Sequence, residues 1–130
     1  MDFKKLITKI HGQVILPGDP TYDEVRQVFY GGINKKPAAI IRVANAQDVK
    51  KAVLFAKENE IELAIRSGGH SVAGYCTTDG GIVIDLRDMK KIEIDAASKT
   101  MWAGRTRRSY IAELVVVIDT FRCGHLLSSL

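Results

Sequence analysis

The chain has 130 residues, of which 46% are hydrophobic; this is typical of one globular domain and excludes disorder for most of the length. The 19 Lys and Arg residues outnumber the 15 Asp and Glu residues, for a net charge of +4. This surplus suits a small anionic ligand but is low for a nucleic-acid-binding protein. The basic start is not a signal peptide, and the apolar run at 111–118 is too short to cross a bilayer. We therefore expect a cytoplasmic protein with no membrane partner.

The first predicted element is a helix at residues 21–29. Thr21 and Glu24 have the spacing of a capping box, which satisfies free backbone N–H groups at a helix start. Helical periodicity places three apolar side chains on one face: Tyr22, Val25 and Phe29. A glycine pair then ends this helix.

Residues 38–66 predict a strand, a helix and a second strand. The run "AAIIRV" at 38–43 is apolar and rich in β-branched residues. Asn45 can cap the helix that follows, whose apolar face comprises Val49, Ala52, Val53 and Ala56. In "IELAIR" at 61–66, Ile61, Leu63 and Ile65 alternate with Glu62, Ala64 and Arg66, which predicts a half-buried strand. If the two strands are parallel neighbours, their crossover is right-handed.

The stretch at 67–81 holds five glycines without periodicity and predicts a loop. A nearly continuous apolar strand at 82–86 follows, and then a hairpin of strands at 92–95 and 100–103. The first 104 residues therefore predict an α+β fold. The tail at 105–130 fits no element well, because its valine-rich run suits a helix and a strand equally.

The loop begins "SGGHS", with two glycines between a strand and His70. Glycines in this position let backbone N–H groups approach an anion such as a diphosphate, and Ser67 and Ser71 add hydroxyl donors. The pattern is neither GxGxxG before a helix nor a P-loop. The alternative is an ordinary turn carrying a solvated histidine.

Four motifs occur together and in order within residues 37–95: "PAAIIRVANAQDV", "RSGGHS", "AGY" and "GGIVIDL". They resemble the N-terminal part of the PCMH-type FAD-binding domain of the vanillyl-alcohol oxidase and berberine-bridge-enzyme superfamily. The resemblance extends more loosely over 12–104. It implies the first α+β subdomain of that domain, a small β-sheet with flanking helices, at residues 1–104, followed by a divergent or truncated tail at 105–130.

The resemblance implies a flavoprotein oxidoreductase in which the loop wraps the FAD pyrophosphate. Histidines resembling His70 are bonded covalently to the 8α-methyl group of the flavin in many relatives, and a neutral imidazole nitrogen is a suitable nucleophile. A complete protein would oxidise a small-molecule substrate by hydride transfer to the flavin. The implied cofactor-binding residues are Arg66, Ser67, Gly68, Gly69, His70, Ser71, Gly74 and Tyr75. No catalytic residue is assigned.

Parts of the family pattern have no counterpart after Gly104, so we expect a fragment whose uncovered apolar faces favour self-association. The competing hypothesis is a non-catalytic protein: a fragment without stable flavin, or a weak anion- or nucleic-acid-binding module acting through the basic tail. We expect no metal site, since the histidines are far apart in the sequence. We also expect Cys76 and Cys123 to be structural thiols, and Asp85 and Asp88 to be solvated loop carboxylates.

Overall fold

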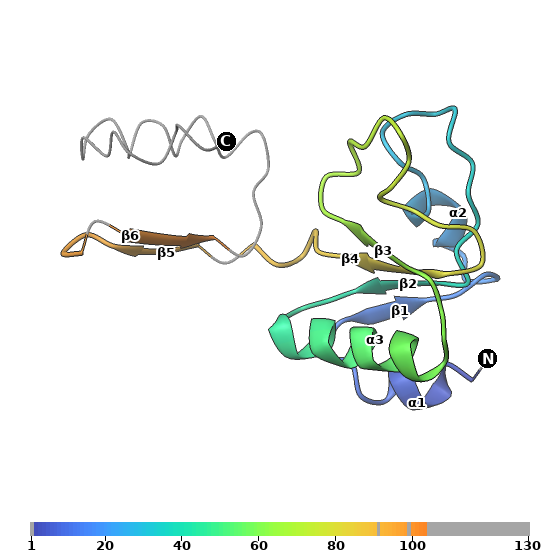
Figure 1. Ribbon diagram of the computed structural model, residues 1–130, viewed down its shortest axis with the longest axis horizontal. Helices are drawn as coiled ribbons and strands as arrows, with labels where there is room; N and C mark the ends of the chain where they lie inside the picture. Colours follow the sequence, from blue (N-terminus) through green and yellow to red (C-terminus); the bar gives the residue numbers. More distant parts are fainter. Residues whose placement is uncertain (1, 91, 99, 104–130) are drawn as a thin grey trace. The chain divides into compact units, whose positions relative to one another are not determined.

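The computed structural model describes residues 2–90, 92–98 and 100–103. The chain divides into two compact units, Met1–Met89 and Lys90–Leu130 (Figure 1). The first unit is a sheet with helices on both faces, and it contains the glycine–histidine loop. The second unit contains a β-hairpin in its described part.

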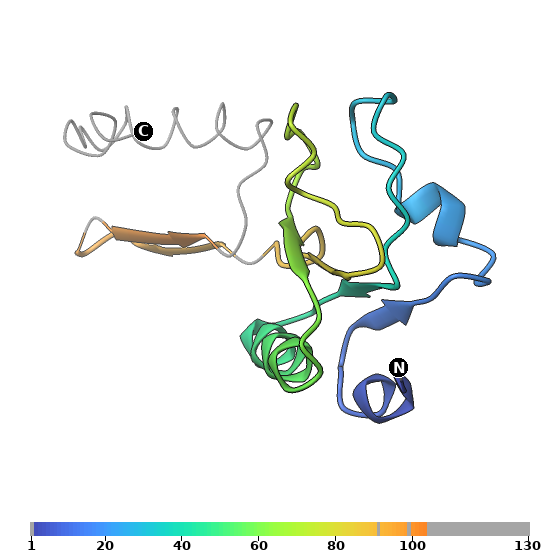
Figure 2. The same ribbon diagram turned by 45° about the vertical axis from the view of Figure 1, so that its right-hand side comes forward.

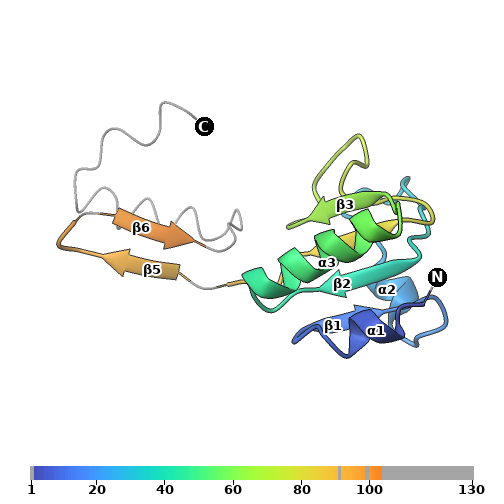
Figure 3. The same cartoon turned by 60° about the horizontal axis from the view of Figure 1, so that its bottom comes forward.

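The sheet of the first unit has four strands in the order β1-β2-β4-β3. Its members are β1 (Gln13–Ile15), β2 (Ala39–Arg42), β3 (Leu63–Arg66) and β4 (Ile82–Asp85). Strands β2, β4 and β3 run parallel, while β1 is antiparallel to β2 (Figure 1; β1, β2 and β3 are also seen in Figure 3). The predicted strands at 38–43, 61–66 and 82–86 are confirmed. The first and second of these strands are parallel but are not neighbours, because β4 lies between them.

Strand β4 is apolar at three consecutive positions because it is the central strand of a sheet covered on both faces. All four of its residues are buried. Alternate side chains enter two separate apolar clusters: Ile82 and Ile84 in one, and Val83 in the other. Neighbouring strands follow the same alternation, with Ile41 in the first cluster and Ile40 in the second.

Helix α3 (Ala46–Glu58) covers the face of the first cluster, together with the short α1 (Lys4–Ile7) (Figures 1 and 2). The predicted cap is confirmed, since the Asn45 side chain accepts a hydrogen bond from the Asp48 backbone N–H at 3.0 Å. Ala52 and Ala56 are fully buried, which lets the helix lie close to the sheet. Val53, predicted on the same face, is 41% exposed and lies at its edge.

The Asp48 carboxylate ties the N-terminal segment to the start of α3. It accepts hydrogen bonds from the backbone N–H groups of His11, Gly12 and Ala44 at 3.0–3.1 Å. The His11 ring Nδ1 lies 3.1 Å from the same carboxylate. Burial by itself raises the pKa of Asp48, but the hydrogen bonds together lower it by more, so the pKa lies below its ordinary value.

Helix α2 (Tyr22–Val25) is much shorter than the predicted helix at 21–29. Tyr22 and Val25 are buried as expected on the second face of the sheet, and the Tyr22 hydroxyl donates to the Pro37 carbonyl at 2.6 Å. The capping-box prediction is wrong, because the Thr21 side chain makes no cap hydrogen bond. Phe29 lies beyond the helix end and is 69% exposed. The helix does not continue, because the carbonyls of Arg26 and Gln27 accept hydrogen bonds from Arg66.

The described part of the second unit is the predicted hairpin of β5 (Ile92–Asp95) and β6 (Thr100–Ala103), which pair antiparallel. Its turn is held by Asp95, whose carboxylate accepts from the N–H groups of Ala97 and Ser98 at 3.0 and 3.2 Å. The predictions for the tail at 105–130, including its basic residues and Cys123, lie outside the described residues. Among the described residues, no helix has the length and apolar character needed to span a membrane.

Candidate functional site

The candidate site is the loop at 67–81, which leaves the carboxyl end of β3 and returns to the start of β4. Ligands of parallel sheets commonly bind beyond the carboxyl ends of the strands. The loop lies beside a second segment, residues 26–36, at the end of the unit away from α3 (Figures 1 and 2). We call residues 26–36 the bracing segment, because hydrogen bonds join it to the loop at several points.

The two glycines before His70 are needed for different reasons. Gly69 has a φ angle of +72°, in the left-handed region that side-chain-bearing residues rarely adopt. Gly68 lies directly beneath the histidine ring: a Cβ atom there would be 2.5 Å from Cδ2 and 2.9 Å from Nε2 of His70. The glycine pair therefore both turns the chain and leaves room for the imidazole.

The His70 side chain is exposed, but one aromatic ring packs against it. The centroids of the Phe29 and His70 rings are 4.9 Å apart, with 54° between the ring planes. The Phe29 backbone N–H also donates to the Gly69 carbonyl at 3.2 Å. The bracing segment thus contacts both the backbone and the imidazole of the glycine–histidine motif.

Arg66 is the last residue of β3, and its guanidinium is buried. Its Nε donates to Asp85 Oδ2 at 3.0 Å, and Nη2 donates to the same oxygen. The two residues are paired in the register of β3 and β4. Arg87 also forms an ion pair with Asp85, with 2.8 Å between Arg87 Nε and Asp85 Oδ2. The buried pair fixes the point at which the loop leaves the sheet.

This pair corrects two predictions from the sequence. The alternation at 61–66 predicted burial of the apolar set, but Ile65 is 60% exposed while Ala64 and Arg66 are buried. Asp85 is a fully buried strand residue rather than a solvated loop carboxylate. The physical reason is the same in both cases, since each charge neutralises the other across adjacent strands. Asp88 is exposed, as predicted, and forms a two-pronged ion pair with Arg42.

Charged side chains of β3 and of the bracing segment connect loop and segment. Arg66 Nη1 lies 3.5 and 3.4 Å from the carbonyl oxygens of Arg26 and Gln27. Lys35 Nζ donates to the Gly74 and Thr77 carbonyls at 3.5 and 3.3 Å. Sequence reasoning did not identify Lys35 or Phe29, because neither belongs to a motif and both contacts join residues about 40 positions apart.

Two hydrogen bonds to Lys36 hold the far end of the loop. The Gly80 N–H donates to the Lys36 carbonyl at 2.9 Å, and the Lys36 N–H donates to the Asp79 carboxylate at 2.7 Å. Within the loop, the Ser71 hydroxyl accepts from the Tyr75 N–H at 3.1 Å. The loop is therefore shaped in advance of any ligand.

The remaining predicted residues differ in exposure. Gly68 and the Tyr75 side chain are exposed, Ser67 and Ser71 are half-buried, and Gly74 is buried with a φ angle of +73°. Cys76 is a buried free thiol, as predicted. Arg66 is 1% exposed, and its carbonyl accepts a hydrogen bond from the Leu86 N–H at 2.8 Å, so the structure places it beneath the loop rather than at its surface.

The loop residues fit a diphosphate-containing cofactor. Within residues 2–90, the backbone N–H groups of Gly68 and His70 donate no hydrogen bond, although both residues are exposed. Free backbone N–H groups in a glycine-rich loop are suitable donors to phosphate oxygens. In the same loop, the buried hydroxyls of Thr77 and Thr78 have no hydrogen-bond partner among the described residues. Sequence reasoning did not single out these two threonines.

Comparisons with known proteins identify the family. A family model described as FAD binding domain matches residues 37–106. The (R)-6-hydroxynicotine oxidase of Paenarthrobacter nicotinovorans is 46% identical over 88 residues, covering 68% of this chain and 19% of the oxidase. Berberine bridge enzyme-like 14 of Arabidopsis thaliana is 34% identical over 76 residues, covering 57% of this chain and 14% of that protein. The crystal structure of 6-hydroxy-D-nicotine oxidase from Arthrobacter nicotinovorans matches with a TM-score of 0.65 and 45% identity, covering 68% of this chain and 19% of that one.

The family model covers more than half of the chain, and the chain belongs to the FAD binding domain family of FAD-linked oxidoreductases. The resemblance to the PCMH-type, berberine-bridge-enzyme-like domain is confirmed, together with its α+β fold and with FAD as the cofactor. The chain spans about one fifth of the length of the oxidase that it matches. Covalent attachment of the flavin stays a prediction, as do the individual cofactor-binding residues.

Proposed function

We propose that this chain supplies the pyrophosphate-binding loop of an FAD-linked oxidoreductase and attaches the flavin covalently through His70. The observation that carries the proposal is the His70 imidazole, which is exposed and held above Gly68 beside two free backbone N–H groups. In the proposed arrangement, the backbone N–H groups of Gly68 and His70 bind the diphosphate. Ser67 and Ser71 stand beside them, and residues 1–104 form the N-terminal part of the FAD domain.

His70 acts as the nucleophile in this proposal. A neutral imidazole nitrogen forms a C–N bond with the 8α-carbon of the flavin, and that carbon loses a proton. The imidazole nitrogen would lose its own proton as well, and bound FAD would pass the two electrons released, with two protons, to molecular oxygen as hydrogen peroxide. Bound FAD supplies a two-electron acceptor, so the complete protein would oxidise a small organic substrate by hydride transfer. The relatives' names support the oxidoreductase class, while the substrate of this protein is not defined by the loop.

The test uses the full 130-residue chain and a chimera in which residues 2–103 replace their counterparts in the (R)-6-hydroxynicotine oxidase. Each protein is incubated with FAD, denatured in acid and separated by electrophoresis. We expect flavin fluorescence on the chimera band, and its loss in His70→Ala. Val72→Ala is the matched control, because Val72 is 72% exposed in the same loop. Fluorescence that survives in His70→Ala, or a yellow chimera that releases all its flavin, would refute covalent attachment through His70.

A further inference from the structure

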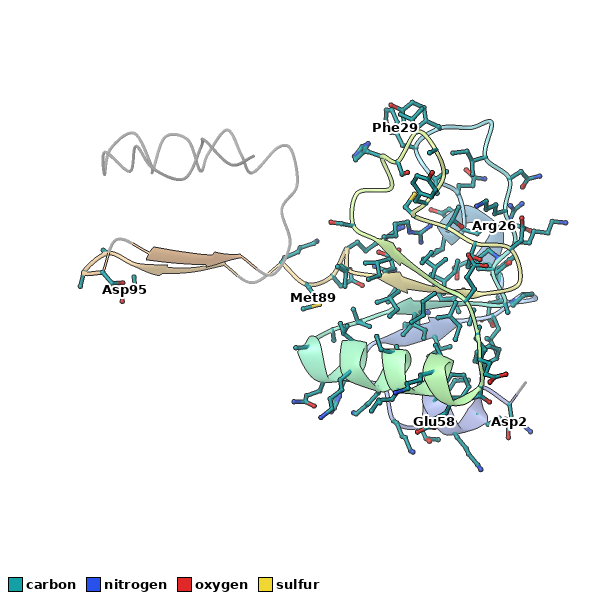
Figure 4. All side chains as sticks on the ribbon, in the orientation of Figure 1. Asp2, Arg26, Phe29, Glu58, Met89 and Asp95 are labelled. Carbon is teal, nitrogen blue, oxygen red and sulfur yellow. The ribbon has the colours of Figure 1, made fainter. Side chains whose placement is uncertain are left out.

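The Phe29 side chain lies on the bracing segment, close to the glycine–histidine loop (Figure 4). It is 69% exposed and belongs to neither apolar cluster, so core packing does not explain its place. Its ring contacts the rings of both His70 and Tyr30, with a centroid distance to Tyr30 of 5.3 Å. We infer that Phe29 is a positioning residue that holds the His70 imidazole in the orientation needed for flavin attachment. This inference rests on the proposed covalent role of His70.

The His70 ring is restricted from two directions. Gly68 lies beneath Cδ2 and Nε2, and the Phe29 ring packs at 4.9 Å with a tilted geometry. Tilted aromatic pairs at this separation attract one another beyond simple area burial. An exposed histidine otherwise samples several side-chain rotamers. The Phe29 contact therefore reduces the number of directions in which the ring nitrogens point.

Phe29 can position another residue only if it is itself fixed. Its backbone N–H donates to the Gly69 carbonyl at 3.2 Å. Nearby in the same segment, the Arg26 and Gln27 carbonyls accept hydrogen bonds from Arg66 Nη1. The Arg66 guanidinium is anchored in turn by the buried Asp85. A continuous series of contacts thus runs from the sheet core to the imidazole, with Phe29 as its last member before His70.

Orientation matters for a covalent step, since misplacing a reacting group by about 1 Å can cost a hundredfold in rate. We expect Phe29→Ala to slow covalent flavin attachment in the chimera by about tenfold or more. Phe29→Tyr preserves a ring of the same shape and should stay within about twofold of the unaltered rate. Val72→Ala removes a similarly exposed apolar side chain from the loop and should leave the rate unchanged.

A second measurement does not depend on flavin. In the 130-residue chain, the His70 ring protons should have NMR chemical shifts displaced by the ring current of Phe29. Phe29→Ala should move these shifts toward the values of free histidine without changing the melting temperature. Val72→Ala should leave the His70 shifts unchanged. Unchanged His70 shifts in Phe29→Ala, or an unchanged attachment rate, would overturn the inference. If the unaltered chimera attaches no flavin, the proposed function fails, and the NMR shifts alone decide whether Phe29 orients His70.

Discussion

The buried Arg66–Asp85 pair offers the sharpest test of how the loop is held. Arg66 is 1% exposed, and its other partners are two carbonyls at 3.4–3.5 Å. Removing one member of a buried ion pair costs about 3–5 kcal/mol because the other charge stays desolvated. Asp85→Leu should therefore remove a large share of the roughly 5–15 kcal/mol that stabilises a domain.

The two single substitutions should not cost the same. In Arg66→Met, Asp85 keeps its ion pair with Arg87 at 2.8 Å. A hydrogen bond to a charged group is worth about 1.5–3 kcal/mol, so Arg66→Met should be less destabilising than Asp85→Leu by about that amount. The double variant leaves no unpaired buried charge and should recover most of the loss.

Urea unfolding followed by circular dichroism gives the four free energies of a double-mutant cycle. The structure predicts strong coupling between the two positions, with Asp85→Leu the least stable protein of the set. Additive losses, or a loss below about 1 kcal/mol for Asp85→Leu, would show that the pair does not anchor the loop.

Two further changes separate stability from site geometry. Gly68→Ala should leave the unfolding midpoint nearly unchanged but displace the His70 ring and slow flavin attachment. Gly69→Ala should instead lower the free energy of unfolding by about 1–3 kcal/mol, because the Gly69 backbone is left-handed. Equal melting temperatures for the two variants would contradict this. The pKa of Asp48 is lower in the folded chain than its ordinary value of about 4. Its carboxylate therefore stabilises the fold at pH values above about 4, and this contribution is lost as the pH falls through the pKa of the folded state. The stability difference between the unaltered chain and Asp48→Asn should therefore shrink on acidification from about pH 7 to about pH 3; a pH-independent difference in urea titrations would contradict the assignment.

The sequence predicted the elements whose signals are local. Asn45 identified the start of α3, and the apolar run at 82–86 identified strand β4. The hairpin followed from two short strands around a polar turn. In each case the pattern arises from residues that are close in the sequence, so the structure confirms the element and changes at most its bounds.

The errors arose where long-range pairing overrides a local pattern. The alternation at 61–66 predicted that Arg66 faces solvent, because the local pattern does not show that Asp85 lies beside it in register. The predicted helix at 21–29 ended early because carbonyls beyond Val25 face the same guanidinium. Strand β1 and helix α1 are short, and neither was predicted. For the site, the family resemblance of four motifs implied FAD, but the contacts of Phe29 and Lys35 required the fold.

The most direct test of the central claim is the mass of one tryptic peptide from the FAD-treated, acid-denatured chimera. Trypsin cleaves after Arg66 and Arg87, and the peptide at 67–87 contains both His70 and Cys76. We expect this peptide to gain the mass of FAD less two hydrogen atoms, and fragmentation to place the flavin on His70, since Cys76 is buried. An unmodified peptide, or flavin on Cys76, would contradict it.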